Sequence, residues 1–244
     1  MIFAPAKSSS RLLATAGVLA LLLGGCSTIP NVTPTPPAAS PATIPPTTPP
    51  YTLAPSPSGC PTAAPAAFSG TATVTMSTNF GNIVIKVDGG LGANAAGAFL
   101  ALSTCGYYND IVFHRIVKGF VIQAGDGTYG RLPNLTQSKI GSGGPGWLIP
   151  DDKVTTAYKR GTLAMANTGS ANSGSSQFFI VLSDTAWDSS TPTTYAIFGN
   201  VTSGMDTVDR IAQVPTGGQT GSGGAADSLP LQPIVITGTT VATP

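Results

Sequence analysis

Charged residues are scarce in this chain of 244 residues: they make up 9% of it, and none of its acids is glutamate. The formal net charge is +1 at pH 7. Lys7 and Arg11 are the only cations among the first 25 residues, and removing them leaves nine cations against ten aspartates, or −1. Such a balance provides no electrostatic attraction to nucleic acid or to an anionic membrane surface. The composition therefore argues against a nucleic-acid-binding function.

Groups that carry covalent or metal chemistry are equally scarce. His114 is the only histidine, and no set of His, Cys and Asp has the spacing of metal ligands. Ser175-Ser176 has no partner base nearby in the sequence, and the glycine-rich run 141–146 lacks the Lys-Ser/Thr of a phosphate-binding loop. We therefore expect no metal and no cofactor, and the glycine-rich run is interpreted as a surface loop.

Long apolar runs are also few, and the clearest lies near the N-terminus. Residues 12–23 are apolar but too short for a typical membrane-spanning helix, Lys7 and Arg11 precede them, and Leu23-Gly24-Gly25-Cys26 follows. This pattern resembles the lipobox of bacterial lipoproteins. The resemblance implies that residues 1–25 are a signal peptide and that Cys26 becomes the lipidated first residue. An ordinary secretory signal with an incidental cysteine is the alternative.

Residues 26–69 are dominated by Pro, Thr, Ala and Ser. Such a segment buries too little apolar surface to offset its chain entropy, so we expect a partly extended tether. At about 3.1 Å per residue, some forty residues would span on the order of 100 Å. The sequence thus predicts a folded domain over residues 70–244, anchored by lipid to the extracytoplasmic side of the cell membrane.

The remaining cysteines agree with export. Once Cys26 is assigned to lipid, Cys60 and Cys105 form an even pair in an oxidising compartment. We expect a disulfide that fixes the end of the tether to the domain and adds roughly 2 to 4 kcal/mol of stability. Two free buried thiols are the alternative.

The domain has the pattern of many short strands. Alternating apolar residues over 73–77 and 83–87, around Asn79-Phe80-Gly81, predict a β-hairpin. Helical spacing predicts short helices over residues 96–103 and 205–211. Further strands are expected over residues 111–117, 120–124, 161–166, 177–182, 196–201 and 234–238. Short strands with glycine-rich turns favour a barrel or a sandwich.

Two of these strands carry polar residues on an apolar surface. Strand alternation places Phe113, Arg115 and Val117 on one side of the first, and Gln123 lies on the second. An unpaired buried polar group costs roughly 1 to 3 kcal/mol, which suggests a functional surface. An arginine snorkelling at a sheet edge is the alternative. The same alternation turns His114 away from Arg115, and we expect it to form a hydrogen bond in the core.

Separate motifs over about residues 73–214 give this pair a specific context. They are Phe113-His114-Arg115, Phe120-Val121-Ile122-Gln123, the stretch from Gly161 through Met165-Ala166-Asn167 to Gln177-Phe178-Phe179, and Tyr195-Ala196-Ile197-Phe198-Gly199-Asn200-Val201. In this order they resemble the cyclophilins, which are peptidyl-prolyl cis-trans isomerases. The resemblance implies a mainly β fold, an eight-stranded antiparallel barrel capped by two α-helices, with the active groove on its outside.

The resemblance also implies a set of site residues. Arg115 and Gln123 would be catalytic; Phe120, Val121 and Phe179 would line a proline pocket; Ala166 and Asn167 would meet the peptide backbone; Gln177, Trp187 and Tyr195 would complete the groove. Ala124 departs from the glycine usual in the family. The loop after Trp187 is longer than usual, so whether Trp187 forms part of the groove rim or only covers a core edge stays open, as does the binding of cyclosporin.

The chemistry of proline isomerisation suits these residue types. Rotation about an X-Pro amide breaks resonance across a barrier of about 18 to 20 kcal/mol but changes no covalent bond. In the twisted state the nitrogen gains a lone pair, which a fixed guanidinium can stabilise. We therefore expect a monomeric isomerase for proline-containing segments of exported or envelope proteins. The alternative is a chaperone module that binds such segments with little turnover.

Overall fold

A computed structural model describes residues 59–133, 135–187, 193–217 and 228–243. The hairpin predicted near the start of the domain is present as two strands of eight residues joined by the turn at Asn79-Phe80. The elements of the described part are β1 (Thr71–Thr78), β2 (Gly81–Asp88), α1 (Ala93–Thr104), β3 (Arg115–Val117), β4 (Val121–Ala124), β5 (Thr162–Met165), β6 (Phe178–Val181), β7 (Ile197–Ser203), α2 (Met205–Ala212) and β8 (Ile236–Ala242).

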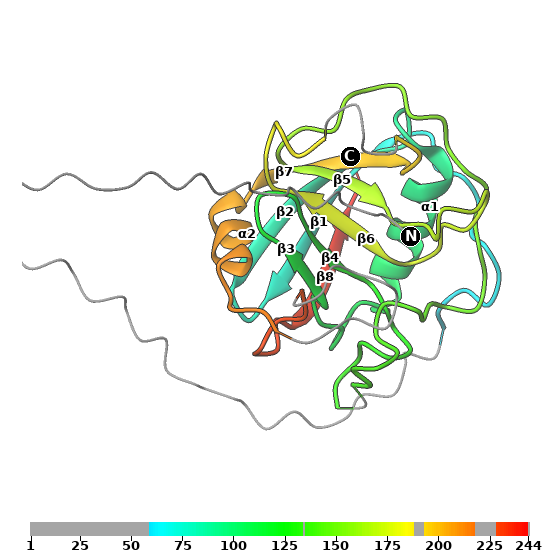
Figure 1. Cartoon of the computed structure of the whole chain (residues 1–244). Helices are drawn as coiled ribbons and strands as arrows, with labels where there is room; N and C mark the ends of the chain where they lie inside the picture. The colour runs from blue at the N-terminus through cyan, green and yellow to red at the C-terminus, as the bar shows by residue number, and fades with distance from the viewer. Residues whose placement is uncertain (1–58, 134, 188–192, 218–227, 244) are drawn as a thin grey trace, which may run out of the picture. The chain divides into compact units, whose positions relative to one another are not determined.

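The eight strands form one antiparallel sheet in the order β3-β4-β6-β5-β7-β2-β1-β8 (Figure 1). The two ends of this order are joined by the segments next to β3 and β8. Val112 forms a β-bridge with Val235, the Phe113 N–H donates to the Ile234 carbonyl at 2.8 Å, and the Ile116 N–H donates to the Ser228 carbonyl at 2.8 Å. The sheet therefore curls into a barrel, as the resemblance implied.

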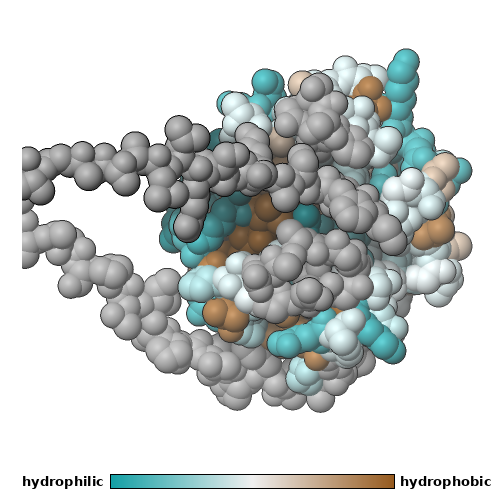
Figure 2. Space-filling view, in the orientation of Figure 1, coloured by the Kyte–Doolittle hydropathy of each residue, from teal (hydrophilic) through white to brown (hydrophobic). Residues whose placement is uncertain are grey.

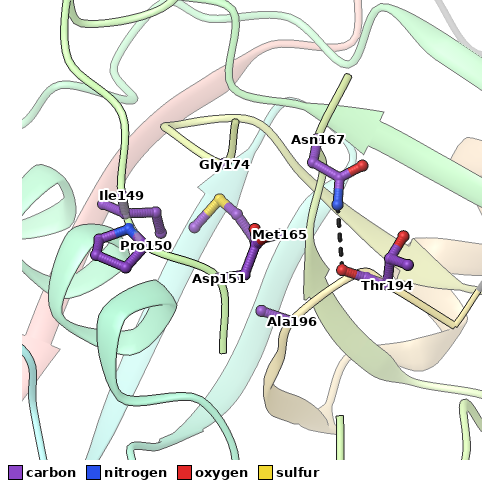
Figure 3. A pocket seen from close by; sticks show the side chains of 8 residues that line it. All are labelled: Ile149, Pro150, Asp151, Met165, Asn167, Gly174, Thr194 and Ala196. Carbon is purple, nitrogen blue, oxygen red and sulfur yellow. Dashed lines mark hydrogen bonds between the residues drawn. The ribbon is translucent and has the colours of Figure 1, made fainter. Parts of the chain in front are cut away.

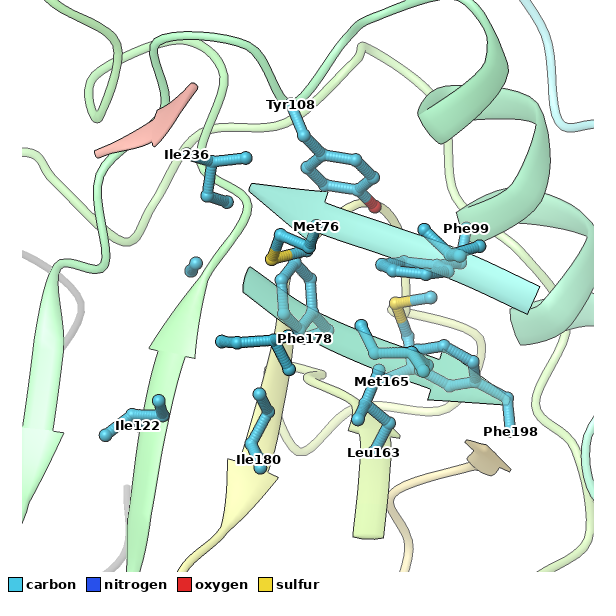
Figure 4. Close-up of a cluster of buried hydrophobic side chains, with 14 of the residues drawn as sticks. Met76, Phe99, Tyr108, Ile122, Leu163, Met165, Phe178, Ile180, Phe198 and Ile236 are labelled. Carbon is cyan, nitrogen blue, oxygen red and sulfur yellow. The ribbon is translucent and has the colours of Figure 1, made fainter. Parts of the chain in front are cut away.

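The interior of the barrel is apolar and lies under α1 (Figure 4). Phe99 of α1 packs against Phe178 and Phe198, with ring centroids 5.3 and 5.1 Å apart. Figure 1 shows α1 on one side of the sheet and α2 on the other. The predicted mainly β barrel with two helices is thus confirmed.

Strands β4, β5 and β6 are apolar on both faces, and their residues alternate between two clusters. Ile122, Phe178 and Ile180 belong to the interior cluster. Val121 and Phe179 belong to a second cluster, which also includes Tyr158, Ala164, Val181 and Ile197. This outer cluster is the surface on which the candidate site is built.

One predicted strand is shorter than expected, and this changes the face of Phe113. Strand β3 begins only at Arg115, because residues 111–114 bond instead to residues 130, 123 and 234–236. Phe113 is 1% exposed and lies in the interior cluster, where it meets Phe178 edge-on at 6.3 Å. The prediction that Phe113 shares a side with Arg115 is therefore wrong.

The expected disulfide joins Cys60 to Cys105, directly after α1. Phe68 packs against the interior cluster, and the Trp147 Nε1–H donates to the Pro61 carbonyl at 3.0 Å. The segment before β1 is thus held at three points. The predicted signal peptide, Cys26 and most of the tether lie outside the described residues.

The described residues contain neither a membrane-spanning helix nor a cluster of metal ligands. Over this part of the chain, no helix has the length and apolar character needed to cross a membrane. Within the same residues, no group of three or more His, Cys, Asp or Glu side chains lies close enough together to hold a metal ion.

Candidate active site

The strand register places the predicted site residues side by side on the outer face. Arg115 of β3 is directly opposite Gln123 of β4, and Gln123 is directly opposite Phe179 of β6. Residues directly opposite each other in an antiparallel pair project to the same face, with their Cβ atoms about 4.5 to 5.5 Å apart. A cation, an amide and an aromatic ring therefore form one continuous row across three strands.

A chain of side-chain hydrogen bonds begins at Arg115. Its Nη1–H donates to Gln123 Oε1 at 3.3 Å, and Gln123 Nε2–H donates to Gln177 Oε1 at 3.0 Å. Gln177 Nε2–H in turn donates to the carbonyls of Gly141 and Gly143, at 3.0 and 2.9 Å. The three predicted polar residues of the groove thus form a single connected network.

The guanidinium of Arg115 is partly desolvated and has no counter-ion in the described part of the chain. Burial lowers the pKa of Arg115, and nearby Tyr195 acts in the opposite direction. Its Nε–H is buried without a hydrogen-bond partner among these residues. Arginine stays protonated in proteins despite such shifts. The site therefore holds a permanent positive charge that no carboxylate of the described residues neutralises.

An aromatic group lies beside this charge. Trp187 stacks on Phe120, Tyr158 and Phe179, with ring centroids 4.9, 4.2 and 5.5 Å apart. Tyr195 meets the ring of Phe179 edge-on at 5.3 Å. Phe179 is only 4% exposed. Trp187 therefore packs against the outer cluster and not at the edge of the interior core.

Figure 2 shows apolar residues on the face turned to the viewer, in the region where Figure 1 places β3 and β4. Val121 is 1% exposed and packs into the same outer cluster as Phe179. The residues predicted to line a proline pocket are thus brought together.

The backbone directly after β5 forms another side of the candidate site. The Ala166 N–H donates to the Gln177 carbonyl at 2.8 Å, which holds Ala166 beside the network. The Asn167 side chain donates to the Thr194 carbonyl at 3.1 Å across a small pocket that also includes Ile149 and Met165 (Figure 3). The Asn167 side chain is thus already bonded within the protein: its amide donates to Thr194, and its Oδ1 accepts from the Gly169 N–H.

Tyr158 was not predicted from the sequence, yet it supports two site residues. Its hydroxyl donates to the Tyr195 carbonyl at 2.7 Å and accepts from the Tyr195 N–H at 3.1 Å, while its ring stacks on Trp187. Burial raises the pKa of Tyr158 to about 12. Neither composition nor periodicity marks this tyrosine, because its partners lie 29 and 37 residues further along the chain.

His114 departs from its predicted role. It is fully buried, as expected, but neither ring nitrogen has a partner with hydrogen-bond geometry in the described structure. Burial lowers its pKa to about 4; Asp126 and the Val112 backbone oppose this shift, and Arg115 adds to it. The expected core hydrogen bond therefore does not reach hydrogen-bond geometry among the described residues, although the Val112 backbone lies near enough to influence the ring.

The outer face of the barrel thus holds an arginine without a counter-ion among the described residues, next to a cluster of aromatic side chains. These features define a class of protein that binds proline segments. Comparison with known proteins agrees. The sequence model of the family described as "Cyclophilin type peptidyl-prolyl cis-trans isomerase/CLD" matches residues 73–241. This chain belongs to that family, and its activity is peptidyl-prolyl cis-trans isomerisation.

Individual relatives are bacterial and eukaryotic. A peptidyl-prolyl cis-trans isomerase of Acinetobacter baylyi is 36% identical over 67% of this chain and 81% of its own length. Peptidyl-prolyl cis-trans isomerase B of Escherichia coli is 34% identical, over 69% and 98%. A Cryptosporidium parvum cyclophilin, solved in the presence of the dipeptide Ala-Pro, has a TM-score of 0.57 and 29% identity, and covers 70% of this chain and 99% of its own.

Proposed function

We propose that Arg115 is the catalytic group, acting on the nitrogen of an X-Pro amide as the amide twists. In the planar ground state the nitrogen lone pair is delocalised and offers little to a cation. In the twisted state the lone pair is localised, and a charge held in place can stabilise it without reorganisation. The single observation that supports this role is the partly buried guanidinium of Arg115, which no described carboxylate pairs with and which lies on the row with Gln123 and Phe179.

The other residues of the site bind different parts of the peptide. The aromatic group around Phe179 receives the proline ring and keeps water away from the rotating bond. The backbone of Asn167 pairs with the peptide on one side of that bond, because the side chain of Asn167 is already bound to Thr194. Holding one side while the other rotates is what a one-step rotation requires. No metal, nucleophile or general base takes part in this scheme.

We further propose that the substrates are exported or envelope proteins with exposed X-Pro bonds. The support is the lipobox-like sequence that ends at Cys26 and the Pro-rich segment that follows it. The Cys60–Cys105 disulfide is consistent with an oxidising compartment, because such bonds are rare in the cytosol.

The catalytic role can be tested with the purified protein in an isomerisation assay on an Ala-Pro-containing tetrapeptide coupled to a protease. Arg115→Ala is expected to lower kcat/KM about 100-fold to 1,000-fold, the usual effect of removing one electrostatic stabiliser. Lys118→Ala is the matched control, since it removes an exposed cation from the turn after β3. A wild-type rate in the Arg115→Ala variant would disprove the assignment; retained peptide binding with no acceleration by the wild type would favour the chaperone reading.

A further inference from the structure

The hydrogen-bond network of the groove continues beyond Gln177 to a buried carboxylate. Asp126 is 0% exposed and lies two residues after the end of β4, just before the turn at residues 127–129. Its Oδ2 accepts the N–H groups of Gly141 and Gly143 at 2.7 and 3.0 Å. These are the two residues whose carbonyls accept from the Gln177 side chain. Gly141 and Gly143 therefore each bind the Asp126 carboxylate through the backbone N–H and the Gln177 side chain through the backbone carbonyl.

The other oxygen of Asp126 fixes the start of the same loop. Its Oδ1 accepts the N–H groups of Thr128 and Tyr129 at 3.0 and 2.8 Å. An ionised carboxylate has about four acceptor sites, and here four backbone amides fill them. Hydrogen bonds to a charged acceptor are roughly twice as strong as neutral ones. Asp126 thus clamps both ends of the loop 128–143.

The close approach of the loop depends on glycine at position 143. A Cβ atom there would lie 2.3 Å from Asp126 Oδ1 and 2.6 Å from Thr128 Cβ, which is closer than such atoms come. No larger residue fits without moving the loop away from the carboxylate. The glycine-rich run 141–146, which the sequence indicated only as a surface loop, therefore has a glycine where the loop approaches Asp126.

The donor and acceptor roles along the network allow only one arrangement. Backbone carbonyls only accept, so both N–H bonds of Gln177 Nε2 are committed to Gly141 and Gly143, and its Oε1 must accept from Gln123. Gln123 then presents its own Oε1 to Arg115, which can only donate. The Gly141 and Gly143 carbonyls thus determine the orientation of the Gln177 side-chain amide, and Gln177 in turn determines that of Gln123.

From this continuity we infer that Asp126 is a positioning residue for Arg115. Asp126 holds the loop carbonyls in place, these fix Gln177, and Gln177 and Gln123 together orient the guanidinium toward the peptide nitrogen. Asp126 itself does not touch the substrate. The inference rests on the proposed catalytic role of Arg115.

Asp126→Asn is the most direct test, because it keeps the size of the side chain and replaces two acceptor sites by an NH2 group facing backbone amides. A misplaced catalytic group can cost about 100-fold, so we expect kcat/KM per folded molecule to fall roughly tenfold to 100-fold. The fall should appear in kcat, while the affinity for the peptide changes less than about threefold.

Asp152→Asn is the matched control. Asp152 also accepts backbone amides, from Asn94 and Ala95 at 3.1 and 2.9 Å at the start of α1, but no hydrogen bond of the described residues joins it to the groove network. It should lower the melting temperature and leave the rate per folded molecule unchanged. Equal effects of the two substitutions on the rate would overturn the inference.

A double variant separates positioning from general destabilisation. If Asp126 acts through Arg115, adding Asp126→Asn to Arg115→Ala should lower the residual rate by less than about twofold. The same fold-loss in both backgrounds would refute positioning. Should Asp126→Asn fail to fold, Gly143→Ala takes its place, since it displaces the loop from the carboxylate and keeps the charge. If Arg115→Ala alone were as active as the wild type, the proposed function would fail instead, which is a distinguishable result.

Discussion

Among single residues, His114 has a charge state that the fold changes within the range of mildly acidic pH. Its pKa falls from an ordinary value of 6.5 to about 4, chiefly because the ring is buried. The folded protein therefore binds a proton at His114 only at a lower pH than the unfolded chain does. Stability from the neutral ring is complete above pH 6.5 and is lost progressively between pH 6.5 and pH 4.

We predict that the free energy of unfolding drops by about 2 kcal/mol between about pH 7 and pH 5, with most of the drop due to His114. Urea unfolding at the two pH values measures it. His114→Leu removes two buried nitrogens that lack partners, so this variant should be at least as stable and should lose most of the dependence on pH. An unchanged slope in the variant would show that another group is responsible.

Trp187 provides a second test at the residue scale, because it stacks on three rings of the groove. A proline ring that reaches Phe179 must alter this packing, since Phe179 is only 4% exposed. We predict a change in tryptophan fluorescence when a proline peptide binds. The chain has two tryptophans. The response should survive Trp147→Phe, because Trp147 is bonded to Pro61, and should vanish in Trp187→Phe.

At the scale of elements, strand alternation predicted the hairpin correctly, and helical spacing predicted both helices. Strand alternation failed at residues 111–114, which have the apolar pattern of a strand but bond to a segment more than 100 residues away. Local sequence has no signal for a partner at that distance. Because β3 begins late, Phe113 and His114 are both buried, and the simple alternation that grouped Phe113 with Arg115 does not apply.

The disulfide joins two elements that the hairpin and sheet leave unconnected: the segment before β1 and the end of α1. We predict that the double variant Cys60→Ser with Cys105→Ser is less stable by about 2 to 4 kcal/mol, because a loop of 45 residues is no longer closed in the unfolded chain. Its kcat/KM should stay that of the wild type, since no residue of the groove network contacts either cysteine in the described structure. Denaturant unfolding and the isomerisation assay check the two halves.

At the scale of the whole molecule, the site could be predicted only in part. Strand alternation singles out Arg115 and Gln123 as polar residues on an apolar surface, and the resemblance adds Phe179 and Gln177. The support behind them is not visible in the sequence. Asp126 and the glycines it binds are 15 and 17 residues apart, and a backbone amide leaves no trace in residue identity. The proposed location is the remaining property of the whole chain.

That location rests on Cys26 and leads to a prediction with a clear control. A thiol that carries lipid holds the protein at the membrane, because each buried CH2 of an acyl chain contributes about 0.8 kcal/mol and more than one chain gives stable anchoring. Cys26→Ser, expressed in a bacterial host, should therefore move the protein from the membrane fraction to a soluble one and abolish incorporation of labelled palmitate. The Cys60→Ser and Cys105→Ser double variant removes two cysteines elsewhere and should stay with the membrane. Wild-type protein recovered in the soluble fraction, or Cys26→Ser retained on membranes, would contradict lipid anchoring at this residue and leave an ordinary secretory signal as the explanation of residues 1–25.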